Sequence, residues 1–221
     1  MNTPLPIKYP TGIIPMRRAF SAKAAYTNIF MYEILPVIQK ISNQSRYGYH
    51  GISHTIQVGL FGIEIAIATK VSPIPVMLAC GLHDCARTND AYCEEHGPAC
   101  VPIAEKMLNE KYSSLGRKTI NKILSAVANH TTGRNAPDEI SACLWDADRI
   151  RLSWELGYNP KFFSTEYGNM IASLSLHDQN KYIAHQDKFL ITSGIYTRAQ
   201  IEYNRCMDAI QSSIGTQFKT R

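Results

Sequence analysis

The sequence lacks patterns that would place it in several familiar protein classes, and its cysteines are the first case. None of the six forms a Cys-x-x-Cys pair, and several lie within apolar segments. A zinc clip built from thiolates is therefore not indicated, and we expect reduced, mostly structural thiols in a cytoplasmic protein. The six are Cys80, Cys85, Cys93, Cys100, Cys143 and Cys206.

Dense positive charge is also missing. The chain has 23 basic and 18 acidic residues, a net charge of +5, and no basic run longer than pairs such as Arg17-Arg18 and Arg117-Lys118. Surfaces that bind nucleic acid usually carry a denser basic cluster. We therefore do not expect nucleic acid as a partner, and infer only a mild preference for anionic ligands.

Long apolar runs are absent as well. Pro4, Pro6, Pro10 and Pro15 interrupt the first 20 residues, so we expect no signal-peptide core there. No stretch approaches the roughly 20 apolar residues that span a bilayer. We therefore expect no membrane partner and a cytoplasmic location.

The alternation typical of strands is nearly absent, whereas helical periodicity recurs along the chain. We expect an all-α bundle, with a proline-rich N-terminal arm at 1–24 and a single all-α domain at 25–221. Pro36 should kink the first helix, and Pro137 should lie in the first turn of its helix. The expected helices cover 28–41, 54–70, 76–87, 96–112, 119–130, 137–157, a segment after Pro160, and 198–213, with a turn at 71–75.

The pair His83-Asp84 follows the apolar run 75–82. Burying two polar side chains together is costly unless a partner replaces their lost hydration. A second pair, His177-Asp178, has no comparable cluster of histidines and aspartates after it, and we interpret it as a solvated loop or a helix cap. The two pairs therefore need different explanations.

Further histidines and aspartates accompany the first pair: His50, His54, His96, His130, Asp146 and Asp148. Each taken singly is explained by an ordinary core or surface position. Five of the seven histidines fall between positions 50 and 130, however, which favours a divalent cation that holds side chains from several helices in the bundle core. Imidazole and carboxylate ligands suit zinc, iron, manganese, cobalt or nickel.

The order of His54, His83-Asp84 and a late aspartate in "DADR" resembles the HD superfamily of metal-dependent phosphohydrolases, over roughly residues 46–155. "HGISHTIQV" is similar to the opening helix of small bacterial HD proteins and to the His-Asn-x-x-His-x-x-x-Val signature of cyclic-nucleotide phosphodiesterases. "LHDCARTND", followed by "EEHGP", is similar to the same small HD proteins. The resemblance implies an HD-domain helical bundle with a metal site in its core.

The resemblance also implies a set of ligands. His54, His83, Asp84 and Asp148 would bind a first ion. Asp148 is preferred over Asp146 because the last ligand of the family usually lies directly before a basic or apolar residue, here the arginine of "DADR". Two residues apart on a helix, these aspartates face nearly opposite ways, so only one would serve. His96 and His130 match the positions that hold a second ion in two-metal members. The sequence leaves open whether a second ion binds.

The activity implied is hydrolysis of a phosphoester or phosphoanhydride in a small phosphorylated substrate, such as a nucleotide, by metal-activated water. His50 would be the general acid, Asp84 a catalytic ligand, and Arg87 a catalytic residue that binds phosphate oxygens. Asn89 and Asp90 are further substrate-binding candidates. Each of these residues also has a purely structural explanation. His50 could only hydrogen-bond to the backbone, and Arg87 could form a surface ion pair with Asp90 or Glu94. Asn89 and Asp90 could cap a helix.

Two other functions stay open. Some HD-like bundles hold two irons and activate dioxygen, and His96 and His130 permit a di-iron oxygenase here. The cluster is also compatible with a non-catalytic metal- or nucleotide-binding signalling module. The segment "NHTTGRNAP" lacks the His-His pair and the Gly-Tyr-Pro signature of the cyclic-di-nucleotide branch. The substrate, the metal and the oligomeric state cannot be read from the sequence.

Overall fold

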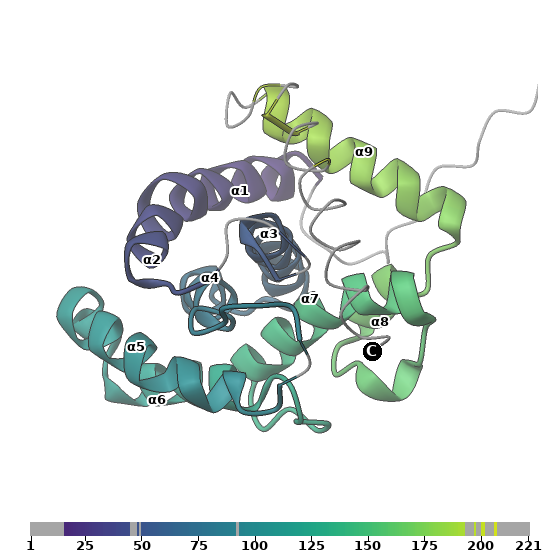
Figure 1. Ribbon diagram of the computed structural model, residues 1–221. Coiled ribbons are helices and arrows are strands. Elements are labelled where there is room, and N and C mark those ends of the chain that lie inside the picture. The colour runs from purple at the N-terminus through teal and green to yellow at the C-terminus, as the bar shows by residue number, and fades with distance from the viewer. Residues whose placement is uncertain are drawn as a thin grey trace, which may run out of the picture.

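The computed structural model describes residues 16–44, 48, 50–91, 93–192, 197, 200, 201 and 206, and helices are the only regular secondary structure among them (Figure 1). The prediction of an all-α bundle is confirmed. The helices pack around an apolar core whose largest buried side chains include Trp145, Phe30 and Leu78.

The first helical stretch begins earlier than its periodicity predicted. Helix α1 spans Met16–Ile29, a π-helical turn η1 spans Phe30–Ile34, and α2 spans Leu35–Ile41. Pro36 has no N–H to donate, and its ring crowds the carbonyl four residues earlier, which accounts for the irregular turn just before it. Figure 1 shows α1 and α2 as parts of one curved path, as expected of a kink near Pro36.

The centre of the bundle is a pair of helices joined by a short link. Helix α3 spans Ile52–Thr69 and α4 spans Pro73–Leu82. Only Lys70, Val71 and Ser72 connect them, so the turn predicted at 71–75 is too long. Pro73 is the first residue of α4, where its missing N–H has no helical partner to lose.

Close packing of α3 on α4 depends on a glycine. A Cβ built on Gly62 would lie 2.5 Å from Sγ of Cys80, nearer than real Cβ contacts allow.

Helix α3 is also the one described helix long and apolar enough to cross a membrane, which the sequence did not lead us to expect. Most of its residues are buried against the rest of the bundle, however, as befits a core helix.

Helix α1 is joined to this centre. Lys23 of α1 forms an ion pair with Glu64 of α3, with 3.0 Å between nitrogen and oxygen. Helix α1 crosses residue 24, where we expected the N-terminal arm to end and the domain to begin. Residues 1–15 lie outside the described part of the chain. The division into an arm and a domain stays a prediction.

Helices α5 and α6 form a second layer beside α4. Helix α5 spans His96–Lys111, the short 3-10 turn η2 spans Ser113–Leu115, and α6 spans Arg117–Asn129. They lie side by side in Figure 1, and α6 packs on both α4 and α7. The start of α5 and the end of α6 meet near the end of α4, where His96 lies close to both His130 and Asp84.

Helix α7 spans Glu139–Leu156 and runs under the central pair. Its N-cap is Asp138, whose carboxylate accepts hydrogen bonds from the backbone N–H groups of Ile140 and Ser141. The prediction that Pro137 lies in the first turn is wrong, because the aspartate caps the helix one residue later.

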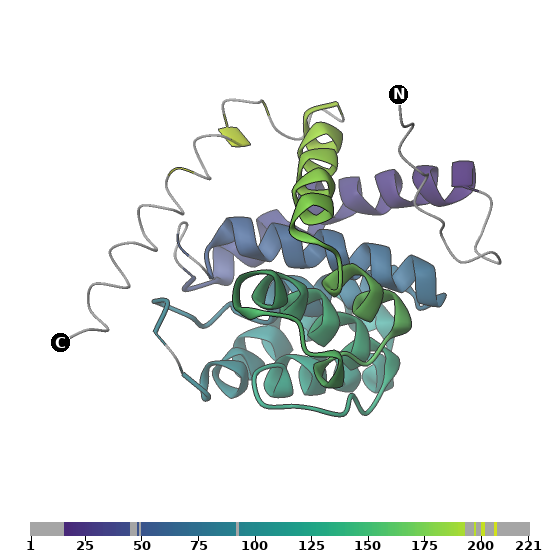
Figure 2. The ribbon, with the colours of Figure 1, turned by 90° about the vertical axis from the view of Figure 1, so that its right-hand side faces the viewer.

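The last described helices cover the outer side of the bundle (Figure 2). A 3-10 turn η3 spans Pro160–Phe162, α8 spans Glu166–Ala172 and α9 spans Leu176–Thr192. The helix expected at 198–213 lies outside the described residues except at positions 200, 201 and 206.

The second His-Asp pair lies at the start of α9. The Ser175 hydroxyl donates to the carboxylate of Asp178 over 2.6 Å, and the Asp178 N–H lies 3.2 Å from the same hydroxyl. His177 is exposed. The pair, which we interpreted as a solvated loop or a helix cap, thus lies in the first turn of α9, where Asp178 bonds to the preceding Ser175.

Candidate metal centre

Three segments deliver the ligands predicted for the first ion to one place. His54 lies in the first turn of α3, and Asp148 lies in the middle of α7. Helix α4 ends at Leu82, so His83 and Asp84 belong to the turn that follows it. Adjacent residues on a regular helix point about 100° apart. Leaving the helix allows both side chains to reach the same cluster.

The first subsite consists of His54, His83, Asp84 and Asp148. Nε2 of His54 lies 3.1 Å from Oδ1 of Asp148 and 3.2 Å from Nε2 of His83. Nε2 of His83 lies 3.3 Å from Oδ2 of Asp84. His54, His83 and Asp84 are buried, so these contacts are shielded from bulk water.

The second subsite consists of Asp84, His96 and His130. His96 begins α5 and His130 follows α6. Their Nε2 atoms lie 2.8 Å apart, and Oδ1 of Asp84 lies 3.2 Å from Nε2 of His96 and 3.7 Å from Nε2 of His130. The two oxygens of Asp84 therefore face different subsites.

The Nδ1 atoms of the rings indicate which nitrogen is free. Nδ1 of His83 lies 2.7 Å from the carbonyl oxygen of Cys80, and Nδ1 of His130 lies 2.7 Å from that of Val127. A carbonyl oxygen only accepts, so Nδ1 donates and Nε2 of the neutral ring carries a lone pair. Histidines that bind metals commonly donate their second nitrogen in this way.

These lone pairs face other acceptors. The short distances between Nε2 atoms, in the pair His54 and His83 and in the pair His96 and His130, are unfavourable unless a proton or a cation lies between the rings. Oδ1 of Asp84 is buried with no hydrogen-bond partner among the described residues. Separations of 2.8 to 3.7 Å match ligands held by bonds of about 2.0–2.2 Å to a shared ion. The donor set therefore fits divalent ions.

The charges of the cluster also favour a cation. Burial alone would raise the pKa of Asp84, but the surrounding imidazoles, His83 above all, hold it well below its usual range. Burial likewise opposes the charge of Asp148, yet hydrogen bonding to His54 and the charge of His83 lower its pKa. Two ionised carboxylates in a buried site need compensating positive charge.

The two imidazoles of the first subsite respond differently to this environment. Burial lowers the pKa of His54 to about 4. Burial also opposes a charge on His83, but the nearby Asp84 carboxylate, with Asp148, outweighs it and raises the pKa of His83 to about 9. Without a bound ion, an additional proton would therefore reside on His83 and not on His54.

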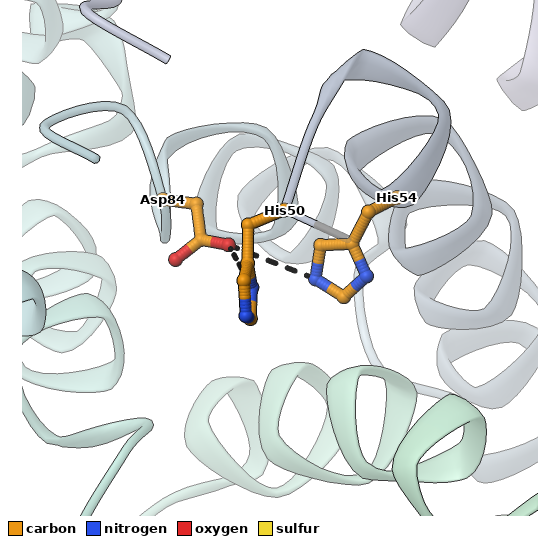
Figure 3. Close-up of side chains that lie close together, drawn as sticks. All are labelled: His50, His54 and Asp84. Carbon is orange, nitrogen blue, oxygen red and sulfur yellow. Dashed lines mark hydrogen bonds and ion pairs between the residues drawn. The ribbon is translucent and has the colours of Figure 1, made fainter. Parts of the chain in front are cut away.

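His50 and Arg87 complete the surroundings of Asp84. Nδ1 of His50 lies 3.1 Å from Oδ2 of Asp84, and Figure 3 shows both His50 and His54 reaching this carboxylate from the start of α3. Arg87 is buried, with Nε 3.3 Å from Oδ1 of Asp84 and Nη2 3.1 Å from Nε2 of His50. The guanidinium thus faces the cluster.

Asn89 and Asp90 lie in the loop that follows. Oδ1 of Asp90 accepts the backbone N–H of His50 over 3.0 Å, and Oδ1 of Asn89 accepts that of Ala91 over 2.9 Å. Asp90 thereby holds the segment that carries His50, whereas Asn89 is exposed and stabilises its own turn. A direct role of either residue in substrate binding stays a prediction.

The two aspartates of "DADR" occupy different environments. Asp148 lies in the first subsite, whereas buried Asp146 accepts hydrogen bonds from the N–H groups of Ser164 and Thr165 and from the Thr165 hydroxyl, at 2.6–2.8 Å. Burial raises the pKa of Asp146 despite these bonds. Since Thr165 is the N-cap of α8, Asp146 holds the start of that helix.

Two residues near the cluster escaped the sequence analysis. The Thr131 hydroxyl lies 3.2 Å from Nε2 of His96. Arg149 donates to the carbonyl oxygens of Gly133 and Phe162, and Nη2 lies 3.4 Å from that of His130. Each directly follows a predicted ligand, and that adjacency was the only signal available.

Comparison with known proteins gives one similarity. No family model matches the chain, and no curated protein does. Among solved structures, the chain is similar to the crystal structure of a predicted HD superfamily hydrolase from an uncultured Thermotogales bacterium. The two share 18% sequence identity with a TM-score of 0.46, over 82% of this chain and 94% of that chain. The helical fold and the two subsites follow from the contacts of this chain itself.

Proposed function

We propose that the protein is a metal-dependent phosphohydrolase that acts on a phosphoester or phosphoanhydride of a small substrate, such as a nucleotide. The observation that carries this proposal is the position of Asp84. One of its oxygens lies 3.3 Å from Nε2 of His83 and the other 3.2 Å from Nε2 of His96. A carboxylate with imidazoles on both sides suits two neighbouring divalent ions.

The proposed ligands of the first ion are His54, His83, Asp84 and Asp148, and those of the second are Asp84, His96 and His130. This set of nitrogen and oxygen donors suits manganese, iron, cobalt, nickel or zinc. Divalent ions bound there would lower the pKa of water and neutralise charge on phosphoryl oxygens.

His50 is the proposed general acid. Its ring contacts Asp84 through Nδ1 and Arg87 through Nε2, and its side chain is 25% exposed, which leaves it accessible to a substrate. A leaving oxygen needs a proton, which an imidazole is suited to deliver near neutral pH.

Arg87 would bind the phosphoryl oxygens. Its guanidinium already contacts Asp84 and His50, so a phosphate that attracts it would lie beside both. If Nη2 turns from His50 to the phosphate, Nε2 of His50 becomes free to take a proton from solvent and then to donate it to the leaving oxygen. Guanidinium groups suit this task because they can form two parallel hydrogen bonds to a phosphate.

A substrate screen tests the proposal. Protein loaded separately with manganese, iron, cobalt, nickel or zinc is assayed for phosphate release or ester cleavage on a panel of nucleotides, sugar phosphates and phosphodiesters. Asp84→Asn is expected to abolish turnover. Asp178→Asn is the matched control, since it alters the aspartate of the other His-Asp pair, at the start of α9, and should retain activity.

Failure of this screen has a clear meaning. Absence of turnover with every ion and substrate, in protein shown to contain metal, contradicts the hydrolase and favours a binding or signalling module. The two imidazoles of the second subsite also suit a second iron, so a di-iron oxygenase is the alternative enzyme. Oxygen uptake by anaerobically loaded iron protein, without phosphate release, would favour it.

A further inference from the structure

Thr131 lies at the edge of the second subsite, where neither the motif nor the proposed ligand set uses it. It directly follows His130, and its side chain is partly buried. Its hydroxyl oxygen lies 3.2 Å from Nε2 of His96. A hydroxyl can donate a hydrogen bond, and its oxygen also has lone pairs that can accept one or face a cation.

The surroundings of His96 show what the hydroxyl adds. Nδ1 of His96 donates to the carbonyl oxygen of Cys93, which leaves Nε2 as the free nitrogen. Around this nitrogen lie Nε2 of His130 at 2.8 Å, Oδ1 of Asp84 at 3.2 Å and the Thr131 oxygen at 3.2 Å. The hydroxyl thus lies as close to Nε2 of His96 as the Asp84 oxygen does, and farther from it than Nε2 of His130. Asp84, His96 and His130 would hold the ion, and the hydroxyl would add one oxygen donor beside them.

The backbone that carries Thr131 is held in place. Arg149 of α7 donates to the carbonyl oxygen of Gly133 and lies near that of His130, so it brackets Thr131 from both sides. A Cβ built on Gly133 would lie 2.3 Å from the ring of Trp145, which shows how closely this segment packs on α7. The hydroxyl is therefore positioned by the same helix that carries Asp148.

We propose that Thr131 supplies a further oxygen donor to the ion of the second subsite and biases that subsite towards harder ions. Oxygen donors such as hydroxyl, carbonyl and carboxylate favour manganese, whereas imidazole suits zinc and the later transition metals. Replacing the hydroxyl by a methyl group removes the donor and preserves the shape of the side chain. This inference rests on the proposed function, because it assumes that His96, His130 and Asp84 hold an ion.

Metal titration tests the inference without an activity assay. Chelator-treated protein is titrated with Mn²⁺ and, separately, with Zn²⁺ by calorimetry, and the bound metal is counted after dialysis. In Thr131→Val, the first equivalent should bind as in the wild type, and the second should bind Mn²⁺ about tenfold or more weakly, the range typical of altered metal surroundings. The loss for Zn²⁺ should be smaller.

Two further variants isolate the hydroxyl. Thr131→Ser keeps the oxygen and should restore binding of the second Mn²⁺. Thr132→Val makes the same chemical change one residue later, at an exposed side chain, and should match the wild type. Unchanged binding of the first equivalent shows that Thr131→Val has folded, and Thr131→Ala provides a second test if it has not.

The outcomes separate this inference from its premise. Two Mn²⁺ equivalents bound equally by wild type and Thr131→Val would overturn the role of Thr131 alone. Tighter binding by Thr131→Val would overturn it too, since the hydroxyl would then compete with the ion for His96. A wild-type protein that takes up fewer than two equivalents would overturn both the inference and the two-ion centre.

Discussion

Nη2 of Arg87 lies 3.1 Å from Nε2 of His50, so a permanently charged donor faces one nitrogen of this imidazole. Arginine has no acceptor, and therefore Nε2 of His50 must accept. The proton of the neutral ring then resides on Nδ1, which donates to Asp84. Arg87 thereby determines the tautomer of His50.

The first prediction concerns Arg87. Arg87→Ala should lower kcat/KM by about 10²–10³, the loss typical of enzymes in which one hydrogen-bond donor to the negative charge of the transition state is removed. Arg87→Lys keeps the charge but not the planar fork and should recover only part of this loss. Steady-state kinetics on the best substrate of the screen measures both. Full activity in Arg87→Ala would exclude a role for the guanidinium in the reaction.

The second prediction separates two roles for His50. As a general acid, His50→Ala should lower kcat by about 10²–10⁴ on esters with poor leaving groups. Esters of acidic phenols need no proton on the leaving oxygen and should lose much less. The metal content should stay at the wild-type value. Because His50, His54 and Asp84 also lie close enough together to share an ion, loss of metal in His50→Ala would identify His50 as a ligand instead.

Some of this site was predictable because its signal is local. His83 and Asp84 are adjacent, follow a strongly apolar run, and are accompanied by histidines at helix ends. Periodicity alone did not show which of Asp146 and Asp148 is the ligand. Periodicity shows that they face different ways, but not which side faces the cluster. Asp146 lies elsewhere because Ser164 and Thr165 return to α7 and donate to it, a contact set by the tertiary fold.

The helices that the sequence reading missed lie on the outside of the bundle. Helix α9 lies at the outside of the bundle (Figure 2). It carries exposed polar residues along much of its length, so it shows little of the apolar stripe that marks a buried face. The beginning of α1 was masked by the prolines before it. Thr131 and Arg149 were missed for another reason. Their partners are side chains and carbonyls that only folding brings near, and no spacing rule encodes them.

The third prediction follows from the separate places of the two aspartates. Asp148→Asn should lose metal at the first subsite. Asp146→Asn should keep both ions but lower the free energy of unfolding by about 1–3 kcal/mol, because it weakens buried hydrogen bonds at the start of α8. Metal analysis and denaturant unfolding of the two variants test this together. Metal loss in Asp146→Asn with full occupancy in Asp148→Asn would reverse the assignment.

The fourth prediction concerns metal removal. An ion that binds the folded chain but not the unfolded one stabilises the fold by about 2.7 kcal/mol at a hundred times its Kd. Chelation should therefore lower Tm, and adding Mn²⁺ should restore it. Asp84 has oxygens facing both subsites, so Asp84→Asn should remove most of the response, whereas Asp178→Asn should respond as the wild type does. If neither the chelator nor Mn²⁺ changes Tm, then protons, and not metal ions, compensate the negative charge of the buried carboxylates.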